Sequence, residues 1–252
     1  MRSGNPALSE STFLDLGSGS VVARPDQAMT LNGTVNKTGL LLLLAVLTAA
    51  YAWSQAIAPD GSMTPAGSLY AIGGAIGGLV LALVTVFKKT WSPVTAPMYA
   101  LVEGLFLGAI SAMFEARFPG IVFQAVLATF GTLVAMLLAY RTGMIKATEN
   151  FKLGVFAATG GIALLYLVSF VLSFFGINVP MIHDSGWLGI AFSVFVVVVA
   201  ALNLVLDFDF IETGVERGAP RYMEWYGAFG LMVTLVWLYV EFLRLLSKIQ
   251  QR

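Results

Sequence analysis

The sequence contains no cysteine and a single histidine, and it carries little charge. Of its 252 residues only 11% are charged, and 14 acidic residues balance 14 basic ones. The absence of cysteine excludes disulfides, thiolate metal sites and cysteine nucleophiles, and one histidine, His183, leaves hardly any room for histidine-based zinc chemistry. The zero net charge gives no attraction toward nucleic acid, so we expect no nucleic-acid partner.

Apolar residues take the place of the missing charge. They make up 58% of the chain, whereas a soluble domain is about half apolar and about a quarter charged. Seven apolar stretches, each close to the roughly 20 residues that a helix needs to cross a bilayer, cover residues 38–58, 68–87, 94–114, 121–140, 154–175, 187–211 and 225–247. None alternates as an outer-membrane strand does, so the sequence predicts an all-α integral membrane protein in contact with lipid.

The two ends of the chain are polar. Residues 1–37 are rich in Gly, Ser, Asn and Thr and are expected to form a disordered tail, followed by a membrane domain over 38–247 and a short basic end over 248–252. Ten lysines and arginines fall on the side of the amino terminus and four on the other, which predicts a cytoplasmic amino terminus. The basic end fits an external position poorly, so a last segment that re-enters the membrane without crossing stays an alternative.

Glycines at a spacing of four mark the second and third stretches. Gly73, Gly74, Gly77 and Gly78 give two overlapping GxxxG patterns, and Gly104 with Gly108 gives a third. Such spacing places glycines on one helical face, where two backbones can approach closely. We favour packing within one chain over a dimer interface.

Acidic residues inside apolar stretches are the candidate functional residues, because an ionised carboxylate at membrane depth is costly unless it is paired, hydrated or protonated. Glu103 lies near the middle of the third stretch, either as a structural acid or as the lining of a polar cavity. Asp207 and Asn203 are four residues apart and share a helical face. Asp209 lies about 200° around the helix from Asp207 and either lines the path or marks the cytoplasmic end of the span. Glu241 is within reach of Arg244, three positions on, as an intrahelical pair, or it faces a proton or cation path.

The last two stretches resemble a known family. The segments 206–211 (LDFDFI) and 238–246 (LYVEFLRLL), together with the Glu-Gly and Leu-Gly-Ala-Ile-Ser pattern in 98–111, resemble the Bax inhibitor-1 family, also called the transmembrane Bax inhibitor motif family, in its bacterial branch. The resemblance extends over roughly 37–247. It implies a seven-helix bundle with the last helix central, located in the bacterial cytoplasmic membrane.

The resemblance also implies a function, a pH-sensitive leak of calcium across the membrane. In the family an acid near the end of the sixth helix and another in the seventh form a pH-sensing pair, and Asp207 and Glu241 match them. Two carboxylates within hydrogen-bond distance share a proton and titrate together. Our hypothesis is that Asp207 and Glu241 gate a cation path and attract Ca²⁺ transiently through their oxygens, with Glu103, Asn203 and Asp209 as further lining residues and no permanent cofactor.

This sequence departs from the family pattern in three ways. The second acid is Glu where close bacterial relatives carry Asp, and a charged segment, 212–224, lengthens the chain between the two acids. The second stretch has no acid, so Glu103 is a feature of this branch.

Other functions compete with the leak. Some bacterial relatives interact with a membrane protease, so a non-conducting regulator that binds other membrane proteins is the alternative. Enzymatic activity is not expected, since an aspartyl protease would show Gly-x-Gly-Asp at its acids and a serine protease would need a histidine base in a span. A retinal protein needs a lysine within the last span, whereas Lys248 lies past its expected end.

Overall fold

The computed structural model describes residues 28–176 and 185–251, and within these residues it is all-helical apart from two isolated bridges. Its helices are α2 (Leu31–Ala56), α3 (Pro65–Phe87), the short 3₁₀ helix η1 (Lys89–Trp91), α4 (Ser92–Arg117), α5 (Ile121–Arg141), α6 (Glu149–Ser173), α8 (Trp187–Glu216) and α9 (Met223–Gln250). Seven of them are long and apolar enough to cross a membrane. The predicted class, an all-α membrane protein with seven spans, is confirmed. His183 lies outside the described residues.

Helix starts and ends differ from the sequence prediction where capping decides them. The hydroxyl of Thr30 accepts a hydrogen bond from Gly33 N, and α2 therefore begins at Leu31, so the prediction of a disordered tail as far as residue 37 is wrong for its last seven residues. Thr64 and Thr148 cap α3 and α6 in the same way. The predicted sixth span ends at residue 211, but α8 continues into the charged segment as far as Glu216. It stops before Gly218, whose φ of 63° suits glycine.

The last helix is a single uninterrupted helix of 28 residues. At 1.5 Å per residue it is roughly 40 Å long, more than the hydrocarbon core is thick. This length favours a complete crossing over the re-entrant alternative.

Burial differs strongly among the spans. In the most apolar window of each helix, 56% of α8 and 50% of α9 is buried, against 17% of α3, α5 and α6. Large apolar side chains such as Leu69, Phe123 and Leu164 are exposed instead, as expected of surfaces that face lipid tails. The central position of the last helix stays a prediction.

The described chain forms two compact units. The first, here called the α4 unit, contains α2, α3, α4 and residues 210–232; the second, the α6 unit, contains α6, α5 from Phe123 onward, and residues 185–209 and 233–251 of α8 and α9.

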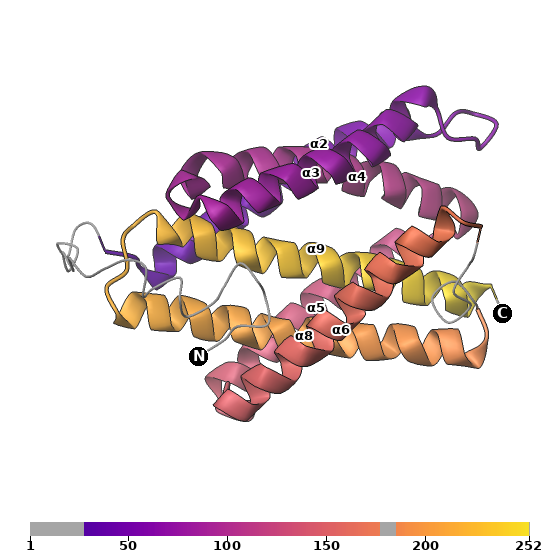
Figure 1. Ribbon diagram of the computed structural model, residues 1–252. Coiled ribbons are helices and arrows are strands. Elements are labelled where there is room, and N and C mark those ends of the chain that lie inside the picture. Colours follow the sequence, from indigo (N-terminus) through magenta and orange to yellow (C-terminus); the bar gives the residue numbers. More distant parts are fainter. Residues whose placement is uncertain (1–27, 177–184, 252) are drawn as a thin grey trace. The chain divides into compact units, whose positions relative to one another are not determined.

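Glycines set the packing of the α4 unit, in which α2, α3 and α4 lie side by side (Figure 1). A Cβ added to Gly108 of α4 would lie 2.2 Å from the carbonyl oxygen of Ala49 of α2, and one on Gly74 of α3 would lie 2.8 Å from Phe106 N of α4. Both approaches leave no room for a methyl group. The interpretation as packing within one chain is confirmed for the Gly74/Gly78 and Gly104/Gly108 patterns, whereas Gly73 approaches no other helix.

Candidate functional site

Glu241 belongs to a partly buried polar cluster in the α6 unit, here called the Glu241 cluster, with Arg244 and Tyr166. Its side chain is buried, and Oε1 accepts hydrogen bonds from the Tyr166 hydroxyl (3.0 Å) and from Arg244 Nη1 (2.9 Å). The same Nη1 donates to the Tyr166 oxygen at 2.6 Å, and the guanidinium lies over the tyrosine ring. The intrahelical pair predicted from the spacing is therefore present, and α6 adds a third member that the sequence did not indicate.

Asp207 is completely buried in α8, but it lies at a different level of the helix pair from Glu241. Near the carboxyl end of α9, Lys248 Nζ donates to Gly189 O and Ser193 Oγ of α8, each at 2.9 Å. Trp237, further up α9, packs against the cluster formed by Ile162 of α6 with Val196 and Val199 of α8. These contacts show that the two helices are antiparallel.

This register places Glu241 opposite residues of α8 near position 196. Asp207 lies several further residues along α8, so the backbones of the two acids differ in level by about 10 Å along the helix axis at 1.5 Å per residue. The direct, proton-sharing pair of Asp207 and Glu241 stays a prediction. The two helices match the family pattern locally, but each acid has its own surroundings, and the sensing roles of Asp207 and Glu241 stay predictions.

Asn203 and Asp209 connect α8 to α6. Asn203 Nδ2 donates to the Thr159 hydroxyl and to Val199 O, both at 2.8 Å. Asp209 Oδ2 forms an ion pair with Lys152 Nζ at 2.7 Å, and the lysine side chain is only 7% exposed. Both side chains therefore tie two helices together, and their predicted role as lining residues remains untested.

Glu103 is the buried acid of the α4 unit. Its side chain is 8% exposed, and its carboxylate rests on the backbone of Gly78 in α3, where a Cβ would lie 2.2 Å from Oε2. The ring of Tyr99, one turn earlier in α4, lies beside the same glycine. No hydrogen bond or ion pair joins Glu103 to another residue in the described part of the chain.

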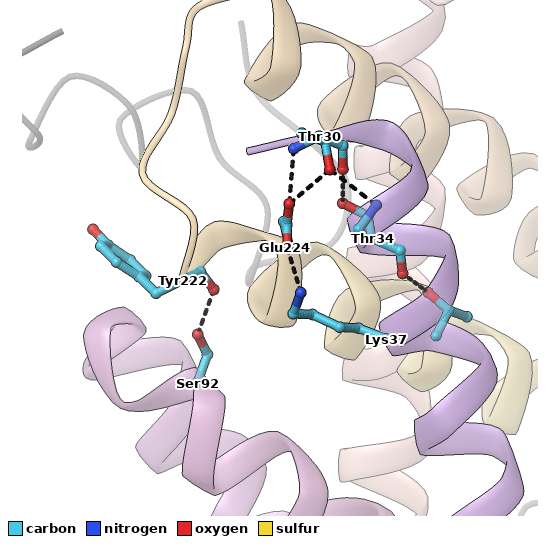
Figure 2. A network of polar contacts seen from close by, with 8 residues as sticks. Thr30, Thr34, Lys37, Ser92, Tyr222 and Glu224 are labelled. Atoms are coloured by element: carbon cyan, nitrogen blue, oxygen red, sulfur yellow. Dashed lines mark hydrogen bonds and ion pairs between the residues drawn. The ribbon is translucent and has the colours of Figure 1, made fainter. Parts of the chain in front are cut away.

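This unit also contains a charged network that the sequence does not indicate. Figure 2 shows Glu224, at the start of α9, receiving hydrogen bonds from the backbone N (2.9 Å) and hydroxyl (2.8 Å) of Thr30 and an ion pair from Lys37. Glu224 is 2% exposed, and the absence of a side chain at Gly33 makes room for its carboxylate. From the sequence, Lys37 is predicted to lie in the tail and Glu224 at the end of a loop. No local sequence pattern indicates a contact between residues 187 positions apart.

The neighbouring links complete this junction. Ser92 Oγ of α4 donates to Tyr222 O at 2.9 Å, as Figure 2 also shows, and Met29 N donates to Ala219 O at 2.6 Å.

On a separate turn between α2 and α3, hydrogen bonds from the Ser62 hydroxyl and backbone lower the pKa of Asp60. That exposed carboxyl is therefore charged at neutral pH and marks a solvent-facing turn.

The described residues do not include any group of three or more acids or histidines placed to hold a metal ion. A resident calcium site normally supplies 6–8 oxygen ligands. The described residues therefore do not form a resident calcium site of this kind, and the transient contact with Asp207 and Glu241 stays a prediction.

Comparison with known proteins assigns the family. No curated protein and no solved structure matches the chain in these comparisons. A family model described as Bax inhibitor 1 like matches residues 5–251. Since that match covers nearly the whole chain and the seven apolar helices agree with it, the chain belongs to the Bax inhibitor 1 like family of multi-pass membrane proteins.

Proposed function

We propose that this protein is a pH-sensitive leak pathway for cations, calcium in particular, in a bacterial cytoplasmic membrane, with its amino terminus in the cytoplasm and no catalytic activity. The observation that carries the proposal is the burial of two acids, Asp207 and Glu241, in α8 and α9, the two most buried spans. Acids at membrane depth are costly to maintain and typically mark ion or proton pathways.

The surroundings of Glu241 suggest how pH acts. While Glu241 is ionised, its charge balances Arg244 and accepts the Tyr166 hydrogen bond between α9 and α6. Protonation removes that charge and leaves the guanidinium without its counter-ion, which weakens the link between the two helices. Asp207 is buried in the same helix pair, and we include it in the gate together with Glu241.

Calcium flux into liposomes tests this proposal. Purified protein is reconstituted around a calcium-sensitive dye, and entry is followed across a pH series for the unmodified chain, Asp207→Asn and Glu241→Gln. The matched control is Glu216→Gln, which neutralises an exposed acid at the end of α8. We expect a pH-dependent leak that both buried substitutions change and the control does not.

Two other results would contradict the proposal in different ways. A leak whose pH profile is the same in all four proteins would separate conduction from these acids. No entry above that of empty liposomes, with the protein shown to be folded, would reject conduction altogether. That second result would favour the alternative, a non-conducting regulator that binds other membrane proteins such as a protease.

A further inference from the structure

Glu103 stands apart from the other buried acids because its carboxylate faces apolar groups and backbone. Its side chain is 8% exposed, in the middle of α4, and its Oε2 occupies the space that a side chain at Gly78 would fill. By contrast, Glu224 of the same unit has an ion pair and two hydrogen bonds. Glu103 is thus a buried carboxyl that meets no counter-charge in the part of the chain that the structure describes.

The elements packed around Glu103 carry few titratable groups. α3 has no charged residue, and the one charged residue of α2, Lys37, is bound to Glu224. Within α4 itself, Glu115 and Arg117 lie more than three turns away. Tyr99 is the titratable group beside the carboxyl, and its ring packs edge-on against Phe229 of α9. In the same part of α9, Tyr226 lies near Phe229, and Glu224 is bound to Lys37 and Thr30.

A single buried carboxyl is suited to bind a proton and not a metal ion. A metal ion needs several oxygen or nitrogen ligands, and the described residues do not gather three acids or histidines anywhere. A proton needs one carboxylate oxygen and removes the charge that makes burial costly.

We propose that Glu103 is a proton-binding site, a carboxyl at the contact of α3 and α4 that takes up and releases one proton inside the membrane. The site does not depend on the leak proposed above, since it uses neither Asp207 nor Glu241. Gly78 is its positioning residue, because any larger side chain would displace the carboxyl.

Dicyclohexylcarbodiimide, an apolar reagent for protonated carboxyls, tests the site in the full chain in liposomes. The acid adds its O–H across one C=N bond of the reagent, and the adduct rearranges to a stable N-acylurea that retains every atom of both reactants. Mass spectrometry of the peptide containing Glu103 gives the fraction of that peptide that carries the adduct. We expect labelling at low pH that falls about tenfold per pH unit on the alkaline side of the titration, and no adduct on this peptide in Glu103→Gln.

A pair of glycine variants tests the geometry. Gly78→Ala would place its Cβ 2.2 Å from Glu103 Oε2, whereas Gly73→Ala on the same helix meets only Leu69 of its own helix, at 3.9 Å. We expect Gly78→Ala to shift the pH profile of labelling and Gly73→Ala to leave it unchanged. If Glu103 reacts in acid-denatured protein but not in folded protein at any pH, or reacts equally at every pH, the proposal is overturned.

Discussion

Replacement of Gly108 by alanine tests the close approach of the α2 and α4 backbones. Gly108 of α4 faces the backbone of Ala49 in α2, and a Cβ there would lie 2.2 Å from that carbonyl oxygen. Ordinary contact begins at 3.4 Å. The two helices would have to separate by about 1.2 Å, because a backbone carbonyl cannot rotate away as a side chain can.

The expected cost follows from two opposing effects. Overpacking of a close interface costs about 1–3 kcal/mol, while alanine favours a helix over glycine by about 1 kcal/mol. Separation of α2 and α4 would also weaken the contact at Gly104, one turn away, which approaches Ala45 O as closely as 2.4 Å for an added Cβ. We therefore expect Gly108→Ala to lower the free energy of unfolding by about 2 kcal/mol.

The assay is thermal unfolding of the protein in detergent micelles. In chains of this size a loss of about 1 kcal/mol in the free energy of unfolding lowers the unfolding midpoint by roughly 2–4 °C. The midpoint of Gly108→Ala should therefore fall by about 4–8 °C. The matched control is Gly39→Ala on α2, where an added Cβ has nothing within 4 Å, and its midpoint should stay the same or rise. Equal midpoints for the two variants would refute the close approach of α2 and α4.

Three further predictions concern charges. Lys37→Met should lower the free energy of unfolding by about 3 kcal/mol, since it leaves Glu224 buried without its counter-ion, and a denaturation series should show that adding Glu224→Gln restores part of that loss. Asp209→Asn should destabilise the protein at neutral pH by about 1–3 kcal/mol by removing the 2.7 Å ion pair of a buried lysine, Lys152; an unchanged midpoint would mean that the ion pair contributes nothing. With a cytoplasmic amino terminus, Pro59→Cys should react with a membrane-impermeant maleimide only from outside the cell and Lys146→Cys only from inside, because both sites are exposed on links at opposite ends of the spans; the reverse pattern would invert the topology.

The spans themselves could be predicted because the bilayer imposes a simple rule. Backbone polar groups without water must bond within the segment, so about 20 apolar residues become a helix whatever surrounds them. The ends were less predictable: α2 begins at Leu31 because Thr30 caps it, and a cap is a local polar contact that apolar length does not reveal.

For the candidate acids, too, one part of the site could be predicted from the sequence and another part could not. The sequence indicated which carboxyls lie in apolar spans, since burial of Asp207, Glu241 and Glu103 follows from their apolar neighbours along the chain. It also predicted the contact of Glu241 with Arg244, because residues three apart meet on any helix. The partners of these acids on other helices could not be predicted from the sequence.

By itself, then, the sequence determined the membrane environment, the helical class, the number of spans and the burial of the acids, all of which depend on composition and on neighbours within a turn or two. Only the tertiary structure decided that Asp207 and Glu241 lie at different levels, that Tyr166 joins Glu241, and that Lys37 meets Glu224. The physical reason is register: a shift of one helix along another changes every contact between them while leaving each helix, and its apolar pattern, unaltered.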